Sequence, residues 1–432
     1  MRTEDVRGWV RANRDRILSV VGDLVRIRTE NLPPGGNEKP GQEYLRQRVS
    51  RFVRGADLDL FEIDDVPGIR AHPLFFPTID GRERLYAGRP NLVARLPGTG
   101  GGRSLVFSGH MDTMPASAEG WTSFPDPFSG AIKDGKLYGR GSADMKTGIA
   151  AGFLALECLH ELGARLRGDV IAESVVDEEN GGVNGTLAAR LRNPDIDFAI
   201  LAEPSGLSVG VETIGGSDWK ASVRVAGPGG IGAGPEQANP IYALARTALA
   251  LQKYDRHLSS LSAPAAWPRD MKIRLLTYQL ASGGSTYTES GAVPTAGHLI
   301  FWQEAYAGTT EEEASTAFLD FVAAELGEDP RAPGSPIRFE RLIRFLNGHR
   351  TDRSHPGLRS IQSAYATLDI PYEEKGVPFA MDAFAFRGAS KTEVAVVGPR
   401  GQNLHGTDEC VEVQSILSLV QIMVLTALDW CA

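Results

Sequence analysis

The sequence predicts an α/β fold: a mostly parallel sheet covered by helices, with a small two-layer α/β domain inserted into it. Apolar strand-like runs alternate with helical ones through the first half of the chain, which is typical of parallel sheets. The texture changes near Gly216, and the alternation returns after residue 348. We therefore expect one domain made of residues 1–215 and 349–432, and an inserted domain made of residues 216–348.

The elements of the first domain follow from apolar spacing. Residues at helical spacing predict one amphipathic helix over 4–28 and a second over 42–54, with later helices over 144–162, 183–191, 357–367 and 413–429. Buried strands are expected in short apolar runs: DLDLFEI from 57, NLVARL from 91, SLVFSG from 104, DVIAESVV from 169, DFAILA from 197 and EVAVVG from 393. Parallel strands of this kind place functional residues where strands end and loops begin.

The inserted domain begins with an alternating strand, WKASVRVAG, from residue 219 and continues into a glycine-rich loop. A helix near 240–257, the strand GHLIFWQE from 297, a helix over 310–326 and the strand PIRFERLIRF from 336 come next. We expect the order strand–helix–strand–strand–helix–strand, which fits a small two-layer domain.

Composition excludes several classes of function. The 432 residues suit two domains, and 45 basic against 54 acidic residues give a net charge of −9. That balance argues against a nucleic-acid or anionic-membrane partner, either of which requires clustered Lys and Arg. The three cysteines, Cys158, Cys410 and Cys431, lack metal-ligand spacing, so we expect no disulfide framework and a cytoplasmic location. The charged N-terminus lacks a secretion signal, and no apolar run of membrane-spanning length is expected.

Five strand or loop ends carry groups suited to metal chemistry. LVFSGHMDT delivers His110 and Asp112, and a carboxylate two residues after a metal-binding imidazole can hold its other ring nitrogen. In GRGSADMKTG, Asp144 begins a helix, where a plain N-cap is the alternative. VVDEENGG runs from a strand into Asp177, Glu178 and Glu179, and like charges so close require a cation or full solvation. AILAEPSG adds Glu203, and NLHGTDE adds His405.

Two imidazoles with several carboxylates and no thiol suit zinc, manganese or cobalt. A bridging carboxylate would allow two metal ions, although sequence gives ligands rather than occupancy, so a mononuclear site stays an alternative. Such a centre lowers the pKa of water, and a Glu adjacent to a ligating Glu is a natural general base.

These five motifs, taken in order, resemble the co-catalytic metallopeptidase family that includes aminoacylase-1, glutamate carboxypeptidase, acetylornithine deacetylase and succinyl-diaminopimelate desuccinylase. The resemblance covers nearly the whole chain and implies a zinc-exopeptidase-like body with an inserted lid and dimerisation domain. It implies the following roles: His110 and Glu203 hold one metal ion, Glu179 and His405 hold the other, Asp144 bridges them, Asp112 orients His110, and Glu178 is the general base. It also implies a homodimer or higher homo-oligomer through the inserted domain.

The inserted domain departs from the family pattern at three places. Ile231 stands where the family usually has a His that helps to stabilise the tetrahedral intermediate, and losing such a donor costs about 100–1000-fold in rate. GAVP at residues 291–294 lacks the usual Asn. Trp302 and Glu304 stand where an Asp and a carboxylate-binding Arg are usual, and Glu reverses that charge.

Two interpretations follow. Either the alignment slips and His298 or His257 takes the missing role, or the substrate is not a C-terminal amino acid. We favour the second, which predicts hydrolysis of a C–N bond in a small non-peptide substrate, with an aromatic amine or amide as one candidate. Trp302, Tyr278, Tyr287 and Tyr306 are candidates for an aromatic pocket, with core or dimer packing as the alternative. An ordinary N-acyl-amino-acid deacylase, dipeptidase or carboxypeptidase and a catalytically inactive family member are further alternatives.

Asp382, in FAMDAF, falls where the family often has an Asp in a loop near the second metal ion. We expect it to support the site or contact substrate. His349 and His355 lie in the return to the first domain, where hinge or surface roles are expected.

Overall fold

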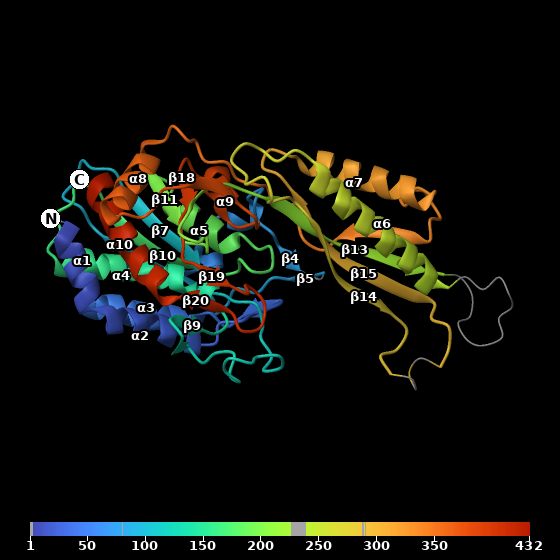
Figure 1. The fold of residues 1–432 in the computed structure, drawn as a ribbon, viewed down its shortest axis with the longest axis horizontal. Coiled ribbons are helices and arrows are strands. Elements are labelled where there is room, and N and C mark those ends of the chain that lie inside the picture. Colours follow the sequence, from blue (N-terminus) through green and yellow to red (C-terminus); the bar gives the residue numbers. More distant parts are fainter. Residues whose placement is uncertain (1–2, 80, 226–238, 287–288, 290) are drawn as a thin grey trace. The chain divides into compact units, whose positions relative to one another are not determined.

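The computed structural model describes residues 3–79, 81–225, 239–286, 289 and 291–432 (Figure 1). Two compact units are present. Unit 1 consists of Met1–Val211, Thr351–Lys375 and Asp382–Ala432, and unit 2 consists of Glu212–Arg350 and Gly376–Met381. The short segment Gly376–Met381 thus belongs to unit 2, although the sequence analysis assigned it to the first domain.

The core of unit 1 is a sheet of eight strands within the described residues, in the order β17-β12-β18-β11-β7-β10-β6-β3. Its four central strands, β18, β11, β7 and β10, run parallel, whereas β3, β6 and β12 pair antiparallel to their neighbours. The strands are β3 Asp57–Glu62, β6 Pro90–Leu96, β7 Leu105–His110, β10 Val170–Val175, β11 Phe198–Leu201, β12 Val209–Thr213, β17 Glu374–Val377 and β18 Glu393–Val396. The predicted α/β class is confirmed; the sheet is mixed, with the parallel strands at its centre.

Helices cover the central strands, every residue of which is buried. Helices α4 and α10 contact β7 and each other, while α5 contacts β10 and α9 contacts β18 as a second group. The helices of unit 1 are α1 Thr3–Ala12, α2 Arg14–Arg26, α3 Lys39–Phe52, α4 Thr147–Glu161, α5 Asn184–Arg192, α8 Pro356–Leu368, α9 Ala383–Ala389 and α10 Val413–Trp430. The single helix expected over 4–28 is therefore two helices, which meet at Asn13.

Helix α10 corrects one expectation about membranes. Among the described helices, it alone is long and apolar enough, by length and composition, to span a membrane. The apolar window is 72% buried inside the protein, and α10 contacts α1, α4 and α8. Its hydropathy is thus explained by its place in the core, since a helix that is apolar on all sides is typical of a buried one.

Short strands outside the main sheet bring loops of unit 1 together. A small antiparallel sheet has the order β19-β20-β9-β8, with β8 Ala131–Lys133, β9 Lys136–Tyr138, β19 Gly401–Gln402 and β20 Cys410–Glu412. The pairs β1 Asn31–Leu32 with β2 Gly35–Gly36, and β4 Thr78–Ile79 with β5 Arg82–Glu83, are shorter still. Two 3-10 turns lie at Ile63–Asp65 and Ile69–Ala71. The sequence pattern predicted none of these strands, because runs of two or three residues carry no periodicity.

Unit 2 has the predicted order strand–helix–strand–strand–helix–strand. Its sheet has the order β14-β15-β13-β16, made of β13 Gly215–Arg224, β14 Leu275–Ser282, β15 Ala296–Ala305 and β16 Ile337–Arg341. Helices α6 Pro240–Ser260 and α7 Glu311–Leu326 pack on one face, where Trp219, Phe301 and Phe318 form the core. The other face carries the alternate residues of each strand, such as Asp218, Lys220 and Ser222 of β13, which are partly exposed.

Candidate metal centre

Four neighbouring strands deliver the predicted site residues to one edge of the main sheet. His110 is the last residue of β7, and β10 runs directly into Asp177, Glu178 and Glu179. Glu203 follows β11 by two residues, and the loop after β18 carries His405. Because β18, β11, β7 and β10 are parallel, their carboxyl ends meet at the same edge, which is where α/β sheets bind ligands.

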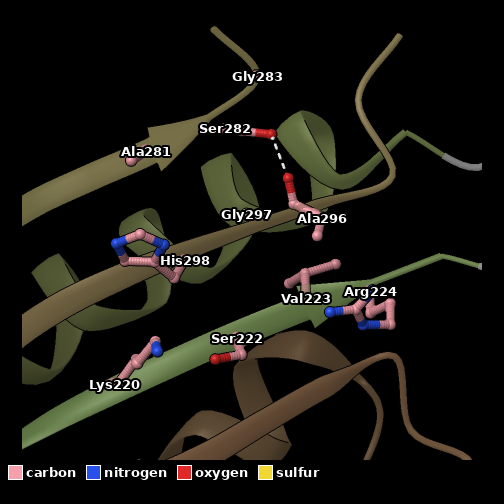
Figure 2. A pocket seen from close by; sticks show the side chains of 10 residues that line it. All are labelled: Lys220, Ser222, Val223, Arg224, Ala281, Ser282, Gly283, Ala296, Gly297 and His298. Atoms are coloured by element: carbon pink, nitrogen blue, oxygen red, sulfur yellow. Dashed lines mark hydrogen bonds between the residues drawn. The ribbon is translucent and has the colours of Figure 1, made fainter. Parts of the chain in front are cut away.

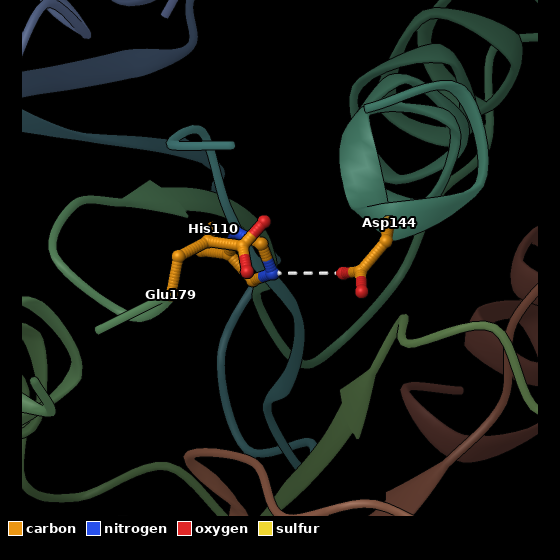
Figure 3. Close-up of side chains that lie close together, drawn as sticks. All are labelled: His110, Asp144 and Glu179. Atoms are coloured by element: carbon orange, nitrogen blue, oxygen red, sulfur yellow. Dashed lines mark hydrogen bonds and ion pairs between the residues drawn. The ribbon is translucent and has the colours of Figure 1, made fainter. Parts of the chain in front are cut away.

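Asp144 lies between the two imidazoles of this cluster. Its Oδ1 is 3.2 Å from Nε2 of His110, and its Oδ2 is 3.3 Å from Nε2 of His405. Glu179 Oε2 is 2.8 Å from Nε2 of His405, and Glu203 Oε1 is 3.6 Å from Nε2 of His110. One ligand atom each from His110, Asp144 and Glu179 lie within 4.8 Å of one another, and Figure 3 shows these side chains converging.

The backbone around Asp144 rules out a plain helix cap. Asp144 has φ −119° and ψ 95° in the turn Ser142–Lys146 before α4, and no capping bond is made there. The side chain instead faces His110 and His405.

Asp112 acts differently from the sequence expectation. The Nδ1 atom of His110 lies 2.8 Å from the main-chain carbonyl oxygen of Asp112, whereas the nearer carboxylate oxygen, Oδ1, is 3.7 Å away. The other oxygen, Oδ2, accepts hydrogen bonds from the backbone N–H groups of Glu178 and Glu179, both at 3.0 Å. The carbonyl of Asp112 therefore orients His110, while its carboxylate holds the loop that carries the two glutamates.

Burial and mutual repulsion dominate the electrostatics of the cluster. Burial raises the pKa of Glu178 and of Glu203 well above the usual carboxyl range. The charge of Glu179 raises the pKa of His405 to about 11. Burial alone would lower the pKa of His110, but its hydrogen bond to Asp144 and the charges of Glu178 and Glu203 raise it well above its ordinary value. So many buried carboxylates around two imidazoles require compensating positive charge.

The donor set fits divalent metal ions. Imidazole nitrogen and carboxylate oxygen suit zinc, manganese and cobalt, and the two oxygens of Asp144 each face a different imidazole, as a bridging ligand requires. His405 closes the cluster from the solvent side, since half of its side chain is exposed whereas that of His110 is buried.

A buried carboxylate that the sequence analysis did not single out ties two of these loops together. Glu409 accepts hydrogen bonds from the backbone N–H groups of Gly141, Ala143 and Asp144, and from the guanidinium of Arg140 at 2.7 Å. Arg140 also donates to the main-chain oxygen of His405 at 2.8 Å. The sequence did contain a signal for Glu409, because this residue belongs to the LHGTDE motif that supplied His405.

Asp382 lies close enough to the cluster to interact electrostatically with His110 and Glu178. Burial raises its pKa to about 7, and its Oδ2 accepts a 2.5 Å hydrogen bond from Thr186. Its negative charge contributes to the raised pKa of Glu178. This agrees with a supporting place beside the site.

The remaining predicted residues lie in unit 2. Trp302 and Glu304 are on β15, where Glu304 accepts a 2.6 Å hydrogen bond from the backbone N–H of Arg274 and burial raises its pKa to about 7. Ile231 and Tyr287 lie outside the described residues. A hollow of about 320 Å³ on the sheet of unit 2 is lined by Lys220, Arg224 and His298 among others (Figure 2).

The histidines weighed as alternatives have ordinary surroundings. His298 lies 3.3 Å from the amide oxygen of Gln279, and His257 stacks on Phe321. His355 begins α8 by accepting a hydrogen bond from Gly357 and stacks on Phe198, while His349 is buried in unit 2. The expected surface role is wrong for His349, which is buried, whereas His355 is partly exposed and caps α8.

Comparisons with known proteins place this arrangement in a family. The model of peptidase family M20/M25/M40 matches residues 106–429. A succinyl-diaminopimelate desuccinylase of Methylobacterium radiotolerans is 40% identical over 365 residues, covering 78% of this chain and 83% of that protein. An N-formyl-4-amino-5-aminomethyl-2-methylpyrimidine deformylase of Halalkalibacterium halodurans is 32% identical over 205 residues, covering 47% of this chain and 42% of that protein, which is less than half of its length.

Solved structures share the fold at low sequence identity. Human carnosine dipeptidase 1 has a TM-score of 0.74 at 13% identity, covering 99% of this chain and 98% of its own. The dipeptidase Dug1p of Saccharomyces cerevisiae has a TM-score of 0.77 at 12% identity, with the same coverage. The match of the family model over most of the chain, together with the desuccinylase relative, shows that this chain belongs to peptidase family M20/M25/M40, as a metal-dependent hydrolase of C–N bonds.

Proposed function

We propose that this hydrolase cleaves the amide bond of a small, non-peptide N-acyl amine, with Glu178 as general base. The observation that carries the proposal is the convergence of His110, Glu179, Glu203 and His405 around Asp144. Glu178 lies beside them, with its Oε2 3.8 Å from Nε2 of His110. A general base must lie within reach of the attacking water, and the place of Glu178 beside the proposed ligands supports that role.

Two divalent metal ions, zinc or manganese with cobalt as a third choice, fit the donor set. His110 and Glu203 would hold one ion, Glu179 and His405 the other, and Asp144 both. When bound, such ions lower the pKa of water and polarise a carbonyl oxygen.

Glu178 supplies the proton transfers of the reaction. Its carboxylate takes a proton from water as the water oxygen attacks the carbonyl carbon of the amide. The protonated Glu178 then gives that proton to the nitrogen as the C–N bond breaks, so a carboxylic acid and an amine leave. Glu178 suits this cycle because its carboxylate lies beside the proposed ligands, 3.8 Å from Nε2 of His110, without being one of them.

The relatives' names support the substrate class. One is named for removing a succinyl group and another for removing a formyl group from an aminomethylpyrimidine, and both groups are small acyl groups on an amine. Trp302 and Glu304, in place of the family's carboxylate-binding pattern, favour an amine-bearing or aromatic substrate over a C-terminal amino acid. The desuccinylase relative supports a second candidate function, that of an ordinary N-acyl-amino-acid deacylase.

A substrate panel distinguishes these candidates. Metal-loaded enzyme is assayed with N-formyl and N-succinyl derivatives of aromatic and heteroaromatic amines, N-acyl amino acids, dipeptides and unacylated arylamines. We expect the highest kcat/KM with the N-acyl aromatic amines. Fast turnover of N-acyl amino acids or dipeptides contradicts the proposed substrate class. No turnover of any amide by enzyme with full metal content favours the inactive family member.

We also propose that a second copy of the chain binds unit 2. Strand β14 lies at the edge of its sheet and exposes Leu276, Tyr278 and Leu280, the last two by 60% and 51%. Helix α6, which contacts β14, exposes Tyr242 and Leu249. An open strand edge beside exposed apolar side chains is a typical pairing surface.

A further inference from the structure

A segment that precedes β6 reaches the back of the metal-binding loop. After the β4–β5 pair, residues 84–89 bury Arg84 and Tyr86, which are 2% and 1% exposed. Both side chains contact Asp177. Asp177 lies two residues after the end of β10 and directly before Glu178 and Glu179. These two contacts join parts of the chain more than 90 residues apart.

The guanidinium of Arg84 spans both ends of this loop. Its Nη1 donates to Oδ1 of Asp177 at 2.6 Å, and its Nη2 donates to the main-chain oxygen of Asn180 at 2.7 Å. Asp177 immediately precedes Glu178, and Asn180 immediately follows Glu179. One planar group therefore fixes the residues on either side of the two glutamates, a geometry that a lysine ammonium cannot reproduce.

Tyr86 holds the other oxygen of the same carboxylate. Its hydroxyl donates to Oδ2 of Asp177 at 2.6 Å and accepts a hydrogen bond from Nδ2 of Asn184. Asn31 donates to Oδ2 of Asp112, which binds the backbone of Glu178 and Glu179, and its Nδ2 lies 3.5 Å from Oδ1 of Asp177. The loop is thus also held through Asp112 and Asn31.

Asp177 has a backbone conformation that requires such support. Its φ of +66° lies in the left-handed region, which a non-glycine residue keeps only where its surroundings hold it there. The close approach of Gly182 adds to the constraint, because a Cβ there would lie 2.6 Å from Oδ2 of Asp177. Asp177 immediately precedes Glu178, so its backbone conformation sets the direction in which the chain enters Glu178 and Glu179.

Charge gives Arg84 a second task. Asp177 is fully buried next to two further carboxylates, and an uncompensated charge there would repel both. The ion pair with Arg84, itself buried, neutralises Asp177 locally.

We propose that Arg84 and Tyr86 are positioning residues for the reaction, acting through Asp177 to hold Glu178 and Glu179 in line with the metal-binding cluster. The inference rests on the proposed roles of those two glutamates.

The test compares three variants of the full-length enzyme. Arg84→Lys keeps the charge but cannot bind Asp177 and the main-chain oxygen of Asn180 at the same time. Tyr86→Phe removes the hydroxyl that binds Asp177. Arg190→Lys is the matched control, because Arg190 forms a fully buried ion pair with Glu173 and lies outside the loop. Three quantities are measured for each variant. They are the zinc affinity, by competition with a chelator; kcat and KM on the best amide substrate; and the melting temperature of the metal-free protein.

We expect Arg84→Lys and Tyr86→Phe to weaken zinc binding and to lower kcat by about 10–100-fold, the range seen when residues that support metal ligands are replaced, while KM changes by less than about threefold. Arg190→Lys lowers the melting temperature but leaves zinc affinity and kcat within about twofold of wild type. If Arg84→Lys does not fold, Tyr86→Phe decides.

The inference is overturned if zinc affinity and kcat of the folded variants stay within about twofold of wild type, or if Arg190→Lys loses as much as they do. Its failure is separable from that of the proposed function. An active Glu178→Gln enzyme contradicts the general base, whereas an inactive Glu178→Gln enzyme beside normal Arg84→Lys and Tyr86→Phe enzymes contradicts only the positioning role.

Discussion

Glu178 and Glu179 are neighbours in sequence, but their carboxylates meet different partners. Glu179 lies 2.8 Å from His405, at the distance of a direct ion pair, whereas Glu178 lies 3.8 Å from His110. Asp112 holds both backbone N–H groups, so the two side chains leave a common, fixed turn. This difference supports separate tasks, with Glu179 as a ligand and Glu178 as a base.

Replacing Glu178 with Gln separates these tasks. The amide keeps the shape of the side chain but cannot take a proton from water, so we expect kcat to fall by about 100- to 10,000-fold. Metal content should remain nearly unchanged, because the five proposed ligands are intact. Elemental analysis of the purified variant, alongside its kcat, checks both statements. Undiminished turnover would remove Glu178 as the base, and loss of metal would make it a ligand instead.

At this scale, sequence reasoning identified the side chains that have chemical groups in recognisable motifs. His110, Asp144, Glu179, Glu203 and His405 were all predicted to lie together, and the structure brings them together. Arg84 and Tyr86 were missed because they stand in a stretch with no motif, and only tertiary contacts bring them to Asp177. The sequence predicted that the carboxylate of Asp112 holds His110. It binds the backbone N–H groups of Glu178 and Glu179 instead, and sequence proximity does not reveal these tertiary contacts.

Among the elements, the pairing of β9 with β20 matters most to the site. Cys410 pairs with Tyr138, which places Glu409 and Arg140 side by side, just beyond the paired residues. Glu409 then binds the turn of Asp144, and Arg140 binds the loop of His405. Two ligand-bearing loops from distant parts of the chain are thereby fixed to one small sheet.

Replacing Glu409 with Gln should loosen both loops. A Gln side chain offers one acceptor oxygen and one NH2 group, so it cannot accept from Arg140 and from the three backbone N–H groups at once. We expect metal affinity to fall by about 10–100-fold, measured by chelator competition. Glu412→Gln is the control, because Glu412 lies three residues after Glu409 and forms only a long, exposed ion pair with Arg400, at 3.9 Å. Equal affinity of the two variants would contradict the role of Glu409.

The sheet of unit 2 contains a carboxylate without compensation. Asp218 lies on β13 opposite Trp302, and its Oδ1 is buried without a hydrogen-bond partner among the described residues. Burial raises the pKa of Asp218 to about 7. An acid whose folded pKa is raised is protonated in the fold at low pH. Its ionisation therefore destabilises the fold as pH rises from about 4, the unfolded pKa, through about 7.

Asp218→Asn should remove this pH dependence. At pH 8 we expect the variant to be more stable than wild type by about 1–3 kcal/mol, and the difference should shrink toward zero near pH 4. Thermal unfolding of both proteins at pH 5, 6, 7 and 8 measures the trend. Asp320→Asn is the control, because Asp320 is exposed and its change should stay within about 0.5 kcal/mol at every pH. A gain that does not depend on pH would contradict burial of the charged carboxylate as its cause.

Long elements were predicted well from the sequence and short ones poorly. The central strands and α10 have continuous apolar runs, so their existence was visible. The break between α1 and α2 at Asn13 was not, because the apolar spacing continues across it. Strand PIRFERLIRF was expected to run to Phe345, but β16 ends at Arg341, where pairing with β13 stops at Trp219.

For the whole molecule, the two units differ in how far their sheets are covered by other parts of the same unit. Unit 1 buries the strands that carry the cluster on both faces. Unit 2 packs helices on one face of its sheet and leaves β14 as an edge strand with a row of exposed side chains. Exposed apolar groups on an edge strand are a liability for a lone chain, because they template pairing with another strand. A second copy bound there would remove that liability.

A charge on β14 should therefore dissociate the oligomer. Leu280→Lys places a cation on the exposed edge strand, and burying it against a second chain would cost several kcal/mol without a partner. We expect wild type to sediment as a dimer or larger oligomer in analytical ultracentrifugation at micromolar concentration, and Leu280→Lys to shift toward the mass of one chain. Ile132→Lys is the matched control, because Ile132 is 48% exposed on β8 of unit 1 and should leave the mass unchanged. A monomeric wild type, or a Leu280→Lys variant that keeps the wild-type mass, would contradict this surface as the contact between copies.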